Sequence, residues 1–101
     1  MTASCNKVVL LGTIGAQGAQ PGTTPTGIPC ARFWLSIDAA SQRTSIPCEA
    51  WGTAPSSATM APGTPVFLEG WLDWRPCAQD PTALLVVCTF DVKRLADDQA
   101  L

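Results

Sequence analysis

Five segments of this chain carry β-branched, aliphatic and aromatic residues, mostly in the period-two alternation that is typical of β-strands. They are residues 6–14, 30–37, 45–52, 66–74 and 83–92. The gap over residues 53–65 contains Pro55, Pro62 and Pro65. It therefore leaves room for at most one short helical turn, around residues 56–61. The pattern predicts an all-β fold of five strands.

The strand over residues 30–37 shows the alternation most clearly. Phe33 and Leu35 fall on one face, and Arg32 and Trp34 fall on the other. Successive side chains of a strand point to opposite sides. We therefore expect Phe33 and Leu35 to lie in the core and the Arg–Trp pair to lie outside.

The first predicted strand is apolar on both faces. Val8 and Leu10 share one face, and Val9 and Leu11 share the other. A barrel buries only one face of each strand, so the second face needs a cover. Phe67 and Trp71 share the outward face of the strand over residues 66–74. The residues expected at a contact between subunits are Val9, Leu11, Phe67 and Trp71.

The connections follow from turn chemistry. Residues 15–27 are rich in Gly, Pro, Gln and Thr and predict a loop that ends in a hairpin turn at Thr26 and Gly27. Short turns are predicted over residues 38–44 and 75–82, the second because it contains two prolines. No stretch suggests a linker or an internal repeat, so residues 1–101 are predicted to form a single domain with a core over about 5–95 and a short polar tail.

The composition limits the cellular location, the metal or cofactor sites and the enzyme activities that can be expected. No apolar run approaches the roughly 20 residues that a membrane helix needs, and residues 1–6 lack a basic segment, so a cytoplasmic protein outside any membrane is expected. The chain has 5 cysteines, none in C-x-x-C spacing, and 0 histidines. Neither a metal site nor another cofactor is expected. Without histidine, a Ser–His or Cys–His pair or a phosphate loop, no enzyme activity is expected either.

The charge balance limits how such a chain can bind nucleic acid. The formal net charge is −2, whereas proteins that bind DNA by bulk electrostatics carry a basic excess. Any nucleic-acid role must therefore rest on a local arrangement of a few cations with aromatic rings.

Four motifs, in order, resemble the bacterial single-stranded DNA-binding protein family and the related primosomal replication proteins. They are NKVVLLGTIG over residues 6–15, TG followed by ARFWLS over residues 26–36, WG over residues 51–52, and GTPVFLEGWL over residues 63–72. The resemblance covers most of residues 5–95. It implies the five-stranded barrel known as the oligonucleotide-binding (OB) fold.

The resemblance also implies a function and a site. It implies binding of single-stranded DNA, with RNA left open, in DNA replication, repair or recombination. Bases would stack on exposed tryptophans and phosphates would meet a few cations. The residues expected to bind DNA are Trp34, Trp51, Trp74, Arg32, Arg75, Lys7 and Arg43. It further implies a homo-oligomer, either a dimer or a tetramer, and contacts with replication or repair proteins.

The chain also departs from the family pattern. The predicted turns over residues 38–44 and 75–82 are short, whereas the family's loops are long and cationic and carry stacking tryptophans. A divergent, trimmed member is therefore expected. A second hypothesis follows from the acidic charge and the short turns: an OB-fold protein-interaction or primosome-type accessory subunit with weak or no DNA binding.

Overall fold

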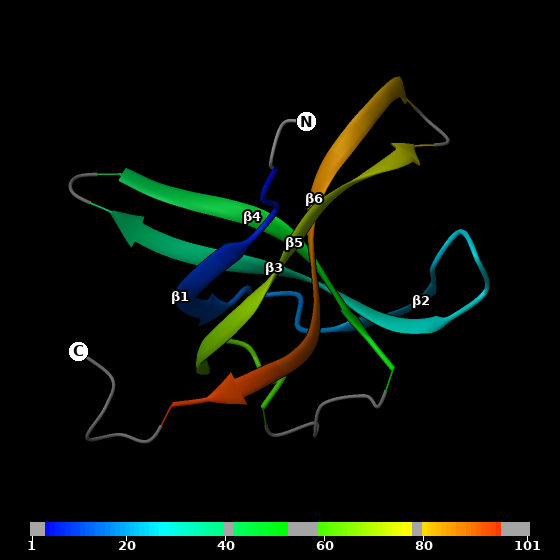
Figure 1. Cartoon of the computed structure of the whole chain (residues 1–101). Helices are drawn as coiled ribbons and strands as arrows, with labels where there is room; N and C mark the ends of the chain where they lie inside the picture. Colours follow the sequence, from blue (N-terminus) through cyan, green and yellow to red (C-terminus); the bar gives the residue numbers. More distant parts are fainter. Residues whose placement is uncertain (1–3, 40–41, 53–58, 78–79, 96–101) are drawn as a thin grey trace.

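The computed structural model describes residues 4–39, 42–52, 59–77 and 80–95 and contains six strands (Figure 1). The strands are β1 (Val8–Ile14), β2 (Gln20–Thr23), β3 (Pro29–Ala39), β4 (Gln42–Trp51), β5 (Pro65–Cys77) and β6 (Asp80–Arg94). No helix occurs in the described part of the chain, and so none there is long and apolar enough to cross a membrane.

Five of the strands close into a barrel. The sheet runs in the order β1-β5-β6-β4-β3-β2, and a second pairing of β1 with β3 closes the barrel and leaves β2 at the edge. All neighbours are antiparallel except β4 and β6, which run parallel. The all-β fold predicted from the alternation pattern and the barrel implied by the family resemblance are confirmed.

The core fills the barrel with alternate residues of each strand. Phe33 and Leu35 of β3 are buried, as predicted, and pack with Val66 and Leu68 of β5. Val8 and Leu10 of β1 lie partly buried against the same cluster. Burying a Leu, Val or Phe side chain stabilises the fold by about 1.5–3 kcal/mol each, so these inward faces are the main source of stability.

The prediction that residues 15–27 form only a loop is wrong, because β2 lies within it. Pro21 and Gly22 of β2 pair with Ala31 and Cys30 of β3. An edge strand tolerates proline and needs no apolar period, since most of it faces solvent. The predicted hairpin turn is confirmed: Gly27 has a φ of 91° and its N–H donates to the Thr24 carbonyl at 2.9 Å.

The turns predicted over residues 38–44 and 75–82 are shorter in the structure than expected. β3 ends at Ala39 and β4 begins at Gln42. β5 ends at Cys77 and β6 begins at Asp80. In the β3–β4 hairpin, Asp38 and residues 42–44 continue the ladder as polar, exposed residues, so no apolar side is required there. The two hairpins project from the barrel in different directions (Figure 1).

Two remaining predictions fall on other segments. The single helical turn around residues 56–61 lies largely outside the described residues, and 59–60 form a turn. Val9 and Leu11 point away from the core, as the alternation of β1 predicts.

Candidate nucleic-acid interface

A row of side chains crosses the outer face of the barrel. Arg32 on β3 pairs with Glu49 on β4, Glu49 pairs with Cys88 on β6, and Cys88 pairs with Trp71 on β5. Paired residues of neighbouring strands project to the same side. These four side chains therefore lie together on the face opposite to the Phe33 core.

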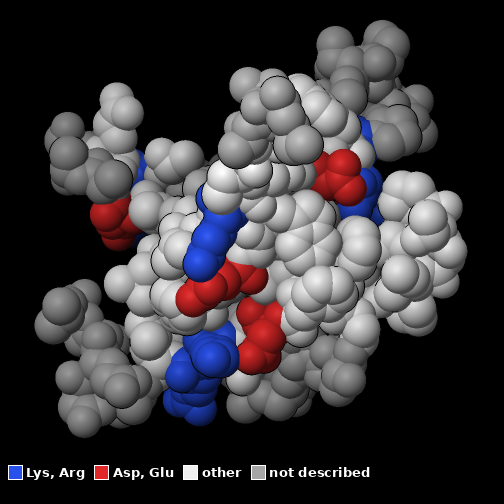
Figure 2. Space-filling view, viewed as in Figure 1, with Lys and Arg blue, Asp and Glu red and all other residues white. Residues whose placement is uncertain are grey.

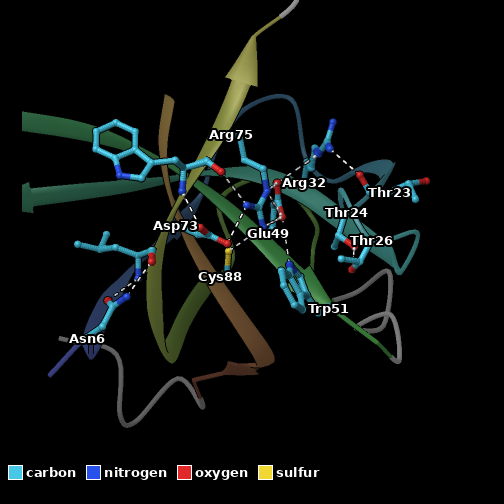
Figure 3. Close-up of polar contacts among 12 residues, drawn as sticks. Asn6, Thr23, Thr24, Thr26, Arg32, Glu49, Trp51, Asp73, Arg75 and Cys88 are labelled. Atoms are coloured by element: carbon cyan, nitrogen blue, oxygen red, sulfur yellow. Dashed lines mark hydrogen bonds and ion pairs between the residues drawn. The ribbon is translucent and has the colours of Figure 1, made fainter. Parts of the chain in front are cut away.

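A buried ion pair lies at the centre of this row (Figure 3). Glu49 is 2% exposed and Arg75 is 8% exposed. Arg75 Nε donates to Glu49 Oε2 at 3.0 Å, and Arg75 Nη2 donates to Glu49 Oε1 at 3.1 Å. The second terminal nitrogen of Arg75 donates to Asp73 and to the Trp74 carbonyl, each at 2.8 Å. The guanidinium is thereby fully engaged within the protein.

The contacts of Arg75 and Asp73 shift the pKa values of both side chains. Burial lowers the pKa of Arg75, but hydrogen bonds to Asp73 and Glu49 outweigh it and raise the pKa above its ordinary value. The hydrogen bond from Arg75, with that from the Trp74 backbone, holds the pKa of Asp73 below its ordinary value. Arg75 therefore stays charged, and its charge is neutralised inside the molecule.

Three aromatic rings pack beside the ion pair. The rings of Trp51 and Trp71 meet edge to face with centroids 5.2 Å apart, and Phe90 lies 5.0 Å from Trp71 and 6.1 Å from Trp51. Trp51 Nε1 donates to Glu49 Oε1 at 3.1 Å, and the Arg75 guanidinium carbon lies 5.7 Å from the Trp51 ring centre. Trp51 and Trp71 are thus half-buried in an aromatic cluster, defined here as Trp51, Trp71 and Phe90.

Trp34 and Arg32 remain more open. Trp34 is 44% exposed on the outer face of β3, where it stands opposite Pro47 of β4. Arg32 lies two residues away on the same face, with half of its side chain exposed. It donates to the Thr23 carbonyl at 2.9 Å and lies 3.6 Å from Glu49. The structure therefore brings Trp34, Arg32 and Trp51 to one face.

Trp74 belongs to a different surface. It is 61% exposed and pairs with Leu85 of β6. Because side chains alternate along β5, it points away from the side that Trp71, Asp73 and Arg75 occupy. The structure does not bring Trp74 together with Trp34 and Trp51.

Each cation predicted to meet phosphate has a carboxylate partner. Arg32 and Arg75 share Glu49, Lys7 lies 3.6 Å from Glu69, and Arg43 lies 2.9 Å from Asp38 on the β3–β4 hairpin. Figure 2 accordingly shows basic and acidic side chains next to one another on this face, with no continuous basic stretch. The electrostatic attraction that this face offers to a phosphate backbone is therefore weak.

Comparison with known proteins addresses the fold. No protein-family model matches the chain, and no curated protein matches it. Among solved structures it resembles the N-terminal domain of PriB protein from Thermoanaerobacter tencongensis, described as dimeric, with a TM-score of 0.72 and 19% identity over 91% of this chain and 98% of that chain. The chain has an OB fold. In all, 144 chains of known structure match it, so the fold by itself assigns no function.

β1 closes the barrel by pairing with both β5 and β3, and its second face is exposed. Val9 and Leu11 are 55% and 53% exposed, and Leu11 pairs with Phe67 of β5. Trp71, grouped with these residues from the sequence, instead contacts Trp51 and Phe90 within the subunit. Trp71 is thus partly covered within the chain, and the role of these four residues in a subunit contact stays a prediction.

Sequence reasoning did not single out two features of this site. Phe90 was read only as part of the last strand, although it is the most exposed large apolar side chain in the described chain. Asn6 extends the β1–β5 ladder with its side chain, donating to the Leu72 carbonyl at 2.9 Å and accepting from the Leu72 N–H at 2.8 Å. The available signal for Phe90 was its alternation with Val86 and Cys88, which places it on the outward face of β6.

The buried thiols of the barrel give a first testable prediction. Burial raises the pKa of Cys48 to about 12, with a smaller contribution from Cys88, and it raises the pKa of Cys88 to about 11 although Arg75 lowers it. For Cys88, a rise in pKa from the ordinary thiol value of 9.0 to about 11 lowers the thiolate fraction about 100-fold. We expect a thiol reagent at pH 8 to label Cys5 at least about 100 times faster than Cys88, measured by peptide mass spectrometry.

The Cys5→Ser variant is the control for this labelling. It should remove the fast phase and leave the slow phase, whose rate should rise with urea as the barrel opens. Labelling of Cys88 in native buffer as fast as that of Cys5 would show that the Cys88 thiol is not buried.

Proposed function

We propose that this protein is a non-catalytic OB-fold module that binds single-stranded DNA on the outer face of β3 and β4. The observation that carries the proposal is the exposed Trp34 beside the half-exposed Arg32 on one sheet face. A base stacked on an aromatic side chain contributes roughly 1–3 kcal/mol, and stacking is tolerant of sequence. The family resemblance of the strand motifs supports the same function.

The ion pairs shape the expected mode of binding. Arg75 is held by Glu49 and Asp73, and Arg32 is shared with Glu49. Few phosphates would therefore be neutralised, and affinity would come mainly from stacking. We infer a modest affinity with a shallow dependence on salt, in a dimer joined through β1, with a role of the primosome or replication type.

The test is a titration with oligothymidine at low and then moderate salt, followed by tryptophan fluorescence. We expect quenching, and a slope of log K against log salt no steeper than about −2, since each phosphate contact on a single strand contributes roughly −0.7. Trp34→Ala should weaken binding about 5- to 100-fold, which corresponds to the loss of one stacked base.

Trp74→Ala is the matched control, because it removes an even more exposed tryptophan from the other surface of β5. Its affinity should stay within about twofold of the parent protein. Equal losses in the two variants would mean that the strand does not follow the β3–β4 face.

A second candidate function is favoured by β1. Val9 and Leu11 expose an apolar stripe, and every predicted phosphate contact is already paired with an acid. These observations suit an OB-fold interaction subunit that works through protein contacts. The titration separates the two, because such a subunit would show no quenching at any salt concentration.

A further inference from the structure

Strand alternation and an irregularity in the β5–β6 ladder together set the surroundings of Phe90. Phe90 follows Cys88 by two residues and therefore points to the same outer face. Leu68 pairs with Val92 and Gly70 pairs with Thr89, so Phe90 and Asp91 together stand opposite the single residue Glu69. The extra residue returns Val92 to the core, and such β-bulges are frequent beside functional sites.

The Phe90 ring packs against two other aromatic rings on one side and is exposed to solvent on the other. Its ring is tilted 43° against Trp71 and meets Trp51 at 88°. Nevertheless 69% of the side chain is exposed. Packing against two aromatic rings fixes the orientation of the phenyl group, so a ligand that stacks on it need not order it first.

The strand register places Phe90 relative to Trp34. β4 separates β3 from β6, so the two residues lie about 10 Å apart across the sheet. Trp34 pairs with Pro47, whose neighbour Cys48 pairs with Val87, and Phe90 lies three residues beyond Val87. The offset along the strands is therefore about 13 Å, and the diagonal is about 16 Å.

Arg32 lies beside the middle of this diagonal. It pairs with Glu49, which pairs with Cys88, so its row is midway between that of Trp34 and that of Phe90. Arg32 itself is on β3, about 5 Å to the side of the midpoint, which falls at the buried Glu49 on β4. A strand that runs from Trp34 to Phe90 thus passes a half-exposed guanidinium within one strand spacing.

We propose that Phe90 is a second base-stacking platform, supported by Trp71 and Trp51, and that the bound single strand runs diagonally from Trp34 past Arg32 to Phe90. This inference rests on the proposed DNA-binding function and adds its direction across the sheet. Stacking on both rings would anchor the strand at two points, and Arg32 would meet the phosphates between them.

The experiment measures the binding of fluorescein-labelled oligothymidine by anisotropy, which does not depend on the protein's own fluorescence. Phe90→Ala should weaken binding about 5- to 100-fold, whereas Phe90→Trp, which keeps an aromatic ring, should stay within about threefold of the parent. Leu85→Ala is the control, because Leu85 is exposed on β6 but belongs to the surface of Trp74. Thermal melts confirm that each variant is folded.

The outcomes separate this inference from the function on which it rests. If Trp34→Ala weakens binding and folded Phe90→Ala does not, the platform is refuted and the DNA-binding function stands. If the parent protein binds no oligothymidine, the proposed function fails and the platform fails with it. If Phe90→Ala converts a dimer into a monomer in sedimentation without changing affinity, Phe90 belongs to a subunit contact and the platform is likewise refuted.

Discussion

A Gly70→Ala substitution is expected to destabilise the barrel by at least about 3 kcal/mol, or to prevent folding altogether. A Cβ at this position would lie 1.8 Å from the carbonyl oxygen of Cys88 and 3.2 Å from the Cα of Thr89. Both atoms belong to the backbone of β6, next to the bulge at Phe90, and backbone cannot rotate away. Two paired strands would have to separate locally, which disrupts the ladder and the core behind it.

Urea denaturation followed by far-UV circular dichroism measures this effect. Gly22→Ala is the matched control: it also adds one methyl group to a glycine in a strand, but the atoms nearest to the new Cβ would belong to the Arg32 side chain, from 2.9 Å. Because that side chain is half exposed and flexible, we expect a change below about 1 kcal/mol. Equal midpoints for the two variants would mean that β6 does not approach Gly70 so closely.

The inward faces of the barrel were predictable from the sequence. Alternation alone placed Phe33 and Leu35 inside and Arg32 and Trp34 outside, because a strand offers only two directions and one must be apolar. The fold class followed for the same reason. The motif Leu68-Glu69-Gly70 also carried information, since the glycine marks the close approach of β6.

Features set by contacts distant in sequence were not predictable. β2 has no apolar period, and the β3–β4 hairpin continues with polar residues that only cross-strand partners stabilise. Arg75 looked like a free cation beside Trp74, but its role depends on Glu49, a residue on another strand. Phe90 faces outward by alternation, but its contacts with Trp51 and Trp71 depend on two other strands.

Glu49→Gln is expected to destabilise the protein by about 3–5 kcal/mol, a large part of the roughly 5–15 kcal/mol that holds a typical domain folded. The substitution keeps the shape of the side chain and its acceptor for the Trp51 N–H but removes the charge. Arg75, only 8% exposed, would then rely on Asp73 alone, whose side chain is 45% exposed. A desolvated cation that has lost its main partner is costly, and Arg32 would lose its partner as well.

Two further variants identify the cause of this loss. Glu69→Gln removes the carboxylate of an exposed pair with Lys7 and should cost less than about 1 kcal/mol. Glu49→Gln combined with Arg75→Met removes both members of the buried pair, and it should be more stable than Glu49→Gln alone because no unpaired buried charge remains. Denaturation midpoints from circular dichroism compare all of them. If the double variant is less stable than the single one, the damage comes from lost packing around Trp51 and Cys88, and the charge of Arg75 is not its source.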